Sequence, residues 1–451
     1  MFNIQLKENL FLPLATCLLL LTSCSIQKQI SQSAHRLVLK DSSLLTAHVG
    51  ISIYEPAKNK YWYNYQGDKY FVPASNVKIP TCYAAMKYLG DSLVGLRYEV
   101  HDTMISILPT GDPTFLHPDF SSTKAIELIK KYRNISLLAN NFFEKKLGSG
   151  WAWNDYLEPY MAERSSFPMY GNMVNFFLKD GWLKTFPSAF QKIIPDLNNR
   201  YLKGIKVFRP FESNAFTFNE GNSKTSIVPF STGGSDLNWL PSLQATLLSD
   251  TMKLSASVGL VGRNQFEIIK RKPFQGFKVF YSQPTDSLLK PMMHRSDNFF
   301  AEQTLLMVSN ELLGVMSDEM IIDTLLKTDF KDLPQKPRWV DGSGLSRYNL
   351  FSPQDFVAIL NKMKNEFPME RIKEILPTGG EGSLSGYYQS DSNYIFAKTG
   401  TLSGVVALSG ILFTKKNRLL IFSVLVNNHQ SSATAVRRVV EQFIKGMRNK
   451  Y

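Results

Sequence analysis

Apolar residues gather in strand-like runs near both ends of this chain. Residues 48–54 and 61–65 lie near its start, and residues 405–413 and 419–426 lie near its end. All four runs are rich in β-branched and aromatic residues, which is typical of strands. A helix is expected over residues 431–447. Because strands from both ends of a chain usually close one sheet, the pattern predicts an α/β (α+β) domain with an antiparallel sheet flanked by helices.

A long middle segment, residues 97–283, has a different pattern of short β-like runs bounded by Gly, Asn and Pro. These runs lie at residues 173–178, 204–209, 215–219, 225–230 and 276–281. A chain of 451 residues is longer than one core usually supports. We therefore expect a discontinuous main domain, residues 24–96 and 284–451, interrupted by a mainly β accessory insertion at 97–283.

The N-terminus predicts export. Residues 10–21 form an apolar run too short to span a bilayer but of the size of a signal-peptide core. The run ends in Leu21-Thr22-Ser23-Cys24, which resembles a bacterial lipobox, where the cysteine is diacylated and becomes the new N-terminus. We expect a signal peptide at 1–23 and a lipid anchor on Cys24. The following Ser25 is not acidic, which favours the periplasmic face of an outer membrane; the alternative is that Cys24 is an ordinary core cysteine.

Cysteine usage fits this compartment. Cys17 would leave with the signal peptide and Cys24 would carry lipid, so the mature chain would retain Cys82 and no intramolecular disulfide. Cys82 lies seven residues after Ser75, which leaves a reactive thiol as one interpretation. A small buried core residue is the favoured one, because free cysteine is among the most buried residue types.

Charge and histidine content limit which partners and cofactors we expect this chain to bind. The net charge of +13 comes from basic residues scattered along the chain rather than gathered in an arm, so we expect no nucleic acid. Anionic wall polymer and lipid headgroups suit such a surface in an exported protein. The six histidines show no metal-ligand spacing, and we expect neither a metal nor an organic cofactor.

The segment Ser75-Asn76-Val77-Lys78 carries candidate chemistry. An extended, Pro-terminated stretch precedes it and an apolar, helix-compatible run at 79–88 follows, so Ser75 is predicted at a helix N-terminus. Free backbone N–H groups there stabilise a developing oxyanion. Lys78 lies three residues on and shares a face with Ser75; it can act as a base only if burial or a neighbouring cation such as Lys398 lowers its pKa. The same Ser-x-x-Lys pattern at Ser25 and Ser121 lacks this setting.

Two further motifs follow in order. Ser296-Asp297-Asn298 precedes an apolar helix at 299–306, where it is either simple capping chemistry or a means of presenting a hydroxyl and an amide to a cleft. Lys398-Thr399-Gly400 ends a strand-like run at 393–397, where it is either an ordinary turn or a place where a ligand approaches the backbone. Finding all three motifs in sequence favours the chemical interpretation of each.

This ordered trio resembles that of penicillin-binding proteins and serine β-lactamases. The chain resembles the serine D-Ala-D-Ala carboxypeptidases of the low-molecular-mass class C penicillin-binding proteins, the peptidase S13 family, which also cleave cross-links as D-Ala-D-Ala endopeptidases. Additional matching stretches lie at 73–78, 111–114, 150–155 and 341–347. Ser75 and Ser296 are 221 residues apart, but Ser296 and Lys398 only 102, which places the insertion after the nucleophile helix. Glu381 and Ser383 stand where the family more often has Asp and Thr.

The resemblance implies a reaction and roles for its residues. Serine-type cleavage of D-Ala-D-Ala in peptidoglycan stem peptides would pass through an acyl-enzyme, and β-lactam antibiotics would acylate the same serine. The implied catalytic residues are Ser75 as nucleophile, Lys78 as base and Ser296 as proton relay. The implied substrate-binding residues are Asn298, Lys398, Thr399 and Thr401, with the backbone N–H groups of Ser75 and Thr401 holding the oxyanion.

Two other functions use the same residues. A serine β-lactamase would carry the trio and clear the antibiotic quickly. The large insertion and the Ser-Asp-Asn form argue against the class C β-lactamases, which carry Tyr in place of that Ser, and no residue is identified as a dedicated water base. A catalytically dead, lipid-anchored wall-binding protein would keep the fold and lose a motif residue. No motif residue is lost in this chain.

Overall fold

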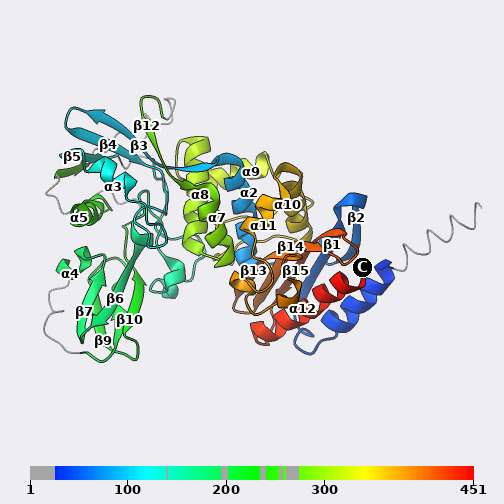
Figure 1. Cartoon of the computed structure of the whole chain (residues 1–451). Helices are drawn as coiled ribbons and strands as arrows, with labels where there is room; N and C mark the ends of the chain where they lie inside the picture. The colour runs from blue at the N-terminus through cyan, green and yellow to red at the C-terminus, as the bar shows by residue number, and fades with distance from the viewer. Residues whose placement is uncertain (1–25, 139–140, 194–201, 234–239, 253–256, 261–273) are drawn as a thin grey trace, which may run out of the picture. The chain divides into compact units, whose positions relative to one another are not determined.

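The computed structural model describes residues 26–138, 141–193, 202–233, 240–252, 257–260 and 274–451 (Figure 1). The chain forms two compact units. The terminal unit holds the described residues up to Pro73 together with Leu333–Pro337 and Leu350–Tyr451. The middle unit holds the described parts of Ala74–Asp332 and Arg338–Asn349. The predicted signal peptide and Cys24 lie outside the described residues.

The terminal unit is built on a five-stranded antiparallel sheet of order β13-β14-β15-β1-β2. Its strands are β1 (His48–Glu55), β2 (Lys60–Tyr65), β13 (Ile395–Leu402), β14 (Val405–Phe413) and β15 (Leu419–Asn427). Strand β1 pairs with β15, which joins the two ends of the chain in one sheet. The predicted antiparallel sheet with strands from both ends is confirmed.

Helices cover both faces of this sheet. Alternate residues of a strand point to opposite faces. Ile51 of β1 belongs to the same core cluster as Phe443 of α12 (Ala433–Lys450). A side chain added at the neighbouring Gly50 would instead meet Phe71 and the first residue of α10 (Pro353–Glu366). Burial on both faces explains why β14 and β15 are apolar along nearly their whole length instead of alternating.

Helix α12 is the predicted C-terminal helix, and its own sequence explains its start and its packing. Ser432 caps it by accepting a hydrogen bond from the backbone N–H of Ala435 at 3.2 Å. Its buried apolar residues recur three or four positions apart and form one stripe: Val436, Val439, Val440, Phe443, Ile444 and Met447. No helix within the described residues has both the length and the apolarity of a membrane span.

The middle unit contains four helices that carry or support the first two motifs: α2 (Lys78–Tyr88), α7 (Thr285–His294), α8 (Asn298–Leu313) and α9 (Asp318–Lys327). Helix α2 packs against α7 and α8, and α8 also packs against α9. Segments that are about 200 residues apart in the chain therefore lie side by side here (Figure 1).

The rest of the middle unit is rich in strands, as predicted. One sheet has the order β11-β5-β4-β3-β12, another β10-β6-β7, and β8 pairs with β9. All five predicted runs are strands: β6 (Met173–Lys179), β8 (Ile205–Phe208), β9 (Thr217–Glu220), β10 (Thr225–Pro229) and β12 (Lys278–Pro284). The additional strands are β3 (Ser92–His101), β4 (Met104–Pro109), β5 (Asn134–Leu137), β7 (Trp182–Phe186) and β11 (Ser257–Leu260). Three additional helices are α3 (Lys124–Ile129), α4 (Ala189–Ile193) and α5 (Leu240–Met252).

The packing of this unit does not follow the predicted limits of the insertion. The limit after residue 96 falls inside β3, which pairs with β12 through Arg97 and Val279. Helices α2 and α8 cluster with the inserted segment and not with the terminal sheet. The division into a main domain (24–96 and 284–451) and an insertion (97–283) remains a prediction.

Gly50 gives a test of how tightly the terminal sheet is packed. An alanine Cβ at this position would lie 2.5 Å from Cε2 of Phe71 and 2.8 Å from Cγ of Pro353. We expect Gly50→Ala to lower the free energy of unfolding by about 1–3 kcal/mol, as overpacking does. Gly446→Ala is the matched control, because nothing lies within 4 Å of its Cβ and alanine gains roughly 1 kcal/mol in a helix. Equal shifts of the two melting temperatures would contradict this packing.

Candidate active site

Ser75 and Lys78 are held together by the start of α2. Residues Ala74–Val77 form a turn of 3-10 helix that runs directly into the α-helix at Lys78. Ser75 is half-buried at this point, and its Oγ lies 3.0 Å from Nζ of Lys78. The predicted position of Ser75 at a helix N-terminus agrees with the structure. The pair therefore has the distance that proton transfer requires.

Lys78 is fully buried, and its amine has three oxygen partners in the middle unit. Nζ donates to Oγ of Ser75, to Oδ1 of Asn298 at 2.7 Å and to the carbonyl oxygen of Ser343 at 2.7 Å. A neutral amine keeps two N–H groups, and Asn298 can accept one of them while the carbonyl oxygen of Ser343 accepts the other. Its lone pair is then left for the hydroxyl proton of Ser75.

Burial is the main cause of a lowered pKa at Lys78. It takes the pKa from 10.5 to about 8, while the carboxylates of Asp341, Glu302 and Asp297 act in the opposite direction. The sequence left two possible causes open, burial and a neighbouring cation. Burial is the largest cause in the structure. A substantial fraction of Lys78 is neutral at mildly alkaline pH, which a general base requires.

The Ser-Asp-Asn motif forms the turn between α7 and α8. Ser296 has a left-handed backbone (φ 61°), which re-aims the chain as α8 begins. Asp297 caps α8 by accepting a hydrogen bond from the N–H of Phe300 at 3.0 Å. Asn298 accepts from Lys78 and donates through Nδ2 to the carbonyl oxygen of Tyr160 at 3.0 Å. Capping and a role at the site thus coexist in one motif, with Asp297 and Asn298 dividing the two tasks.

A buried turn that begins at Asp341 packs against the backbone next to Ser75. Oδ1 of Asp341 accepts the N–H of Gly344 at 2.8 Å, and Oδ2 accepts the N–H of Ser346 at 2.7 Å and Nε1 of Trp151 at 3.0 Å. Gly344 has φ +83°, and an added Cβ would lie 1.9 Å from the carbonyl oxygen of Ala74. Glycine is required here because the turn passes so close to the residue before Ser75.

The Lys-Thr-Gly motif belongs to the terminal unit. We expected it to end a strand, but β13 continues through it to Leu402, because its residues keep pairing with β14. Lys398 is fully buried, and its Nζ donates to the carbonyl oxygen of Thr399 at 2.7 Å. The exposed Thr401 accepts a hydrogen bond at Oγ1 from Arg437 of α12.

The structure thus brings three predicted site residues into contact within one unit: Ser75, Lys78 and Asn298. Ser296 lies in the same unit, two residues before Asn298. Lys398, Thr399 and Thr401 share one strand of the other unit. Cys82 is fully buried in α2, in agreement with the favoured core interpretation.

Sequence reasoning did not identify the carbonyl groups of Ser343 and Tyr160 as parts of the site. Both are backbone oxygens, so no side chain marks them. Glu302 could have been noticed, because it is an acidic residue inside an otherwise largely apolar stretch of α8.

A comparison with known protein families identifies the family of this chain. A family model described as the D-Ala-D-Ala carboxypeptidase 3 (S13) family matches residues 31–447. The chain belongs to this family. The match confirms the resemblance inferred from the motifs and the predicted class of enzyme, a serine-type D-Ala-D-Ala carboxypeptidase.

Individual relatives agree with this assignment. A D-alanyl-D-alanine carboxypeptidase of Actinomadura sp. is 24% identical over 453 residues, covering 88% of this chain and 80% of the relative. The D-alanyl-D-alanine carboxypeptidase DacB of Haemophilus influenzae is 26% identical over 196 residues, or 41% of this chain and 40% of the relative. The crystal structure of penicillin binding protein 4 from H. influenzae has a TM-score of 0.67 at 19% identity and covers 92% of this chain and 98% of that chain. This likeness confirms the predicted fold class.

The lowered pKa of Lys78 predicts how acylation depends on pH. At pH values below the Lys78 pKa of about 8, most of the amine is protonated and cannot accept the proton of Ser75. The acylation rate should therefore rise by up to about tenfold per pH unit from pH 6 and level off above pH 8. Lys78→Ala should lower the rate about 10²- to 10⁴-fold and remove this dependence. Stopped-flow acylation by a chromogenic penicillin between pH 6 and 9.5 measures both, and a flat profile for the unmodified enzyme would exclude Lys78 as the base.

Proposed function

We propose that this chain is a D-Ala-D-Ala carboxypeptidase, with D-Ala-D-Ala endopeptidase activity, acting on peptidoglycan stem peptides through an acyl-enzyme on Ser75. The observation that carries the proposal is the buried Lys78 amine at 3.0 Å from Oγ of Ser75, with Asn298 and Ser343 accepting its other hydrogens. This arrangement suits a serine activated by an adjacent base.

In the proposed reaction Lys78 takes the proton of Ser75 as Oγ attacks the carbonyl carbon of the penultimate D-Ala. The oxyanion is held by the backbone N–H groups of Ser75 and Thr401. Ser296 relays the proton that Lys78 took to the leaving amine as the peptide bond breaks, and D-Ala departs. Water then attacks the ester and returns the free hydroxyl of Ser75.

The terminal carboxylate of the substrate is proposed to bind at the Lys-Thr-Gly strand. Lys398 supplies positive charge, and the hydroxyl groups of Thr399 and Thr401 donate to the carboxylate oxygens, a charge-assisted contact. The guanidinium of Arg437, which already contacts Thr401, adds positive charge to the same strand. Asn298 is proposed to orient the substrate amide as well as Lys78.

A β-lactam should acylate the same serine. A solved structure of the H. influenzae protein contains a novel β-lactam, which is a property of that relative and supports the proposal for this chain. Hydrolysis of a penicilloyl ester requires a well-placed water base, and no residue here is assigned to that task. The penicilloyl-enzyme is therefore expected to be long-lived, which separates this function from that of a β-lactamase.

Replacement of the nucleophile tests the proposal. Ser75→Ala should lose covalent labelling by a fluorescent penicillin and should release no D-Ala from muropeptides. Ser121→Ala is the matched control, because Ser121 begins another Ser-x-x-Lys sequence but is exposed and outside the site, so it should label normally. Mass analysis of the muropeptide products reports terminal and cross-link cleavage separately. Persistent labelling of the Ser75→Ala protein would place the nucleophile elsewhere, and rapid nitrocefin turnover without muropeptide cleavage would identify a β-lactamase.

We also propose that Cys24 is lipidated and anchors the exported protein to the envelope, at the periplasmic face of the outer membrane. The lipobox-like sequence before Cys24 supports this. Cys24→Ala should yield an unlipidated, wrongly processed protein, whereas the unmodified protein should partition into detergent. Cys17→Ala is the control, because residue 17 would leave with the signal peptide. A water-soluble native protein with another N-terminus would refute the anchor, and membrane fractionation tests its location.

A further inference from the structure

Glu302 is a buried acid that shares a hydrogen-bonding partner, Ser343, with Lys78. It lies one helical turn after Asn298 on α8, so the two side chains share a face of the helix. Only 1% of its surface is exposed. A carboxyl group at such a depth is costly unless its oxygens have partners, and its partners therefore show what it does.

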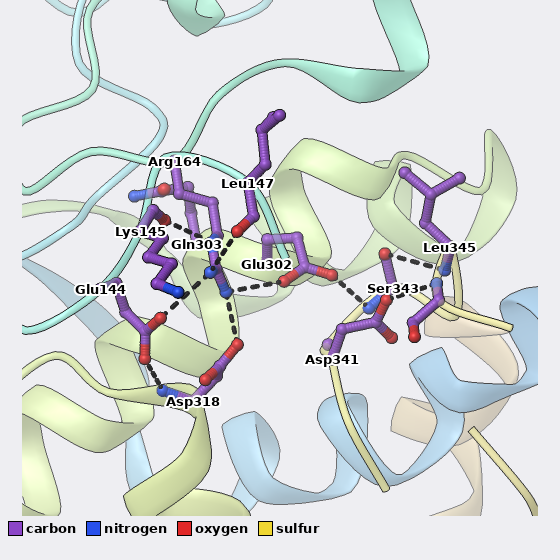
Figure 2. A network of polar contacts seen from close by, with 12 residues as sticks. Glu144, Lys145, Leu147, Arg164, Glu302, Gln303, Asp318, Asp341, Ser343 and Leu345 are labelled. Atoms are coloured by element: carbon purple, nitrogen blue, oxygen red, sulfur yellow. Dashed lines mark hydrogen bonds and ion pairs between the residues drawn. The ribbon is translucent and has the colours of Figure 1, made fainter. Parts of the chain in front are cut away.

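One carboxyl oxygen of Glu302 reaches the residue that holds Lys78. Oε1 accepts the backbone N–H of Ser343 at 2.8 Å, and the carbonyl oxygen of the same Ser343 accepts Nζ of Lys78 at 2.7 Å. Figure 2 shows Glu302 pointing toward Ser343, beside Asp341. Glu302 thus holds the backbone N–H of Ser343, and the carbonyl oxygen of Ser343 in turn holds Lys78.

The other carboxyl oxygen of Glu302 faces Arg164. Oε2 lies 3.6 Å from Nη1 of Arg164, which is itself 1% exposed. The same guanidinium pairs with Asp318 and, at 3.0 Å, with Glu144. It also donates to two backbone carbonyls, those of Lys145 and Leu147, each at 3.2 Å (Figure 2). Arg164 is therefore held in place by several contacts that do not involve Glu302.

We propose that Glu302 is a positioning residue for Lys78, acting through Ser343, and that Arg164 from the inserted segment holds Glu302 in place. The inference rests on the proposed role of Lys78 as the base. Loss of the Glu302 carboxyl would leave the buried N–H of Ser343 without an acceptor. The Ser343 carbonyl could then turn away, and Lys78 would lose one of its three partners.

The charge of Glu302 also acts on Lys78. The titratable and charged groups that face Glu302 are Arg164, Lys78 of α2, Asp341 of the supporting turn and Asp318 of α9, with Glu144 beyond Arg164. Burial raises the pKa of Glu302 above its ordinary value, Asp341 acts in the same direction, and Arg164 acts in the opposite one. A negative Glu302 stabilises protonated Lys78. A neutral glutamine should therefore lower the pKa of Lys78 and move the acid limb of acylation to lower pH.

Three variants test the proposal. Glu302→Ala should acylate at least tenfold more slowly per folded molecule, because Lys78 loses its support. Glu302→Gln keeps an oxygen acceptor for the N–H of Ser343 and should recover most of the rate, with the acid limb displaced to lower pH. Glu144→Gln removes a carboxylate from the same Arg164 without contacting Ser343. It should keep the rate within about twofold and leave the pH profile unchanged.

The measurement is the second-order rate of acylation by a chromogenic penicillin from pH 6 to 9.5, scaled to the folded fraction found by circular dichroism. An unchanged rate in Glu302→Ala, or equal pH profiles in Glu302→Gln and Glu144→Gln, would overturn the positioning role. If Glu302→Ala does not fold, the comparison of the two glutamine variants decides the question. An unmodified enzyme that does not acylate at Ser75 would instead refute the proposed function itself.

Discussion

The burial of the Lys78 amine is the constraint on which the rest of the site depends. A lysine in water is protonated at neutral pH and cannot act as a base. Removing it from water lowers its pKa, but a buried amine must then find partners for every N–H. The oxygens of Ser75, Asn298 and Ser343 supply those partners. The same three contacts orient the amine toward the serine hydroxyl, so one arrangement solves both the solvation problem and the chemical one.

Much of the middle unit supports these contacts. Asn298 is oriented by a backbone carbonyl of the inserted segment, that of Tyr160. Ser343 lies in a turn that Asp341 organises and that passes close enough to Ala74 to require Gly344. Ala74 itself has a left-handed backbone, with φ 46°. Unusual backbone conformations thus gather around the nucleophile, as is common where the surrounding packing over-determines a functional site.

The sequence predicts the parts of this structure that local spacing controls. Ser75 and Lys78 are separated by one helical turn, so their contact follows once α2 is recognised. Much of the terminal sheet was predictable because two of its strands, β14 and β15, are nearly continuous apolar runs. The mixed sheet that contains β3, β4 and β5 was not, because β3 pairs with the distant β12, and β5 pairs in parallel with β4. The continuation of β13 past Gly400 was missed because its pairing with β14 outweighs the low strand propensity of glycine. The Ser343 carbonyl was invisible, since any residue supplies a carbonyl.

The most direct test of this account is the titration of Lys78 itself. Protein labelled with ¹³C at lysine Cε can be followed by NMR across pH 6 to 11, with the Lys78 resonance assigned by its absence in Lys78→Met. The account predicts a midpoint at about 8 for this resonance. A midpoint near 10.5, the ordinary value for lysine, would contradict it, because the amine would then be protonated throughout the working range and could not activate Ser75.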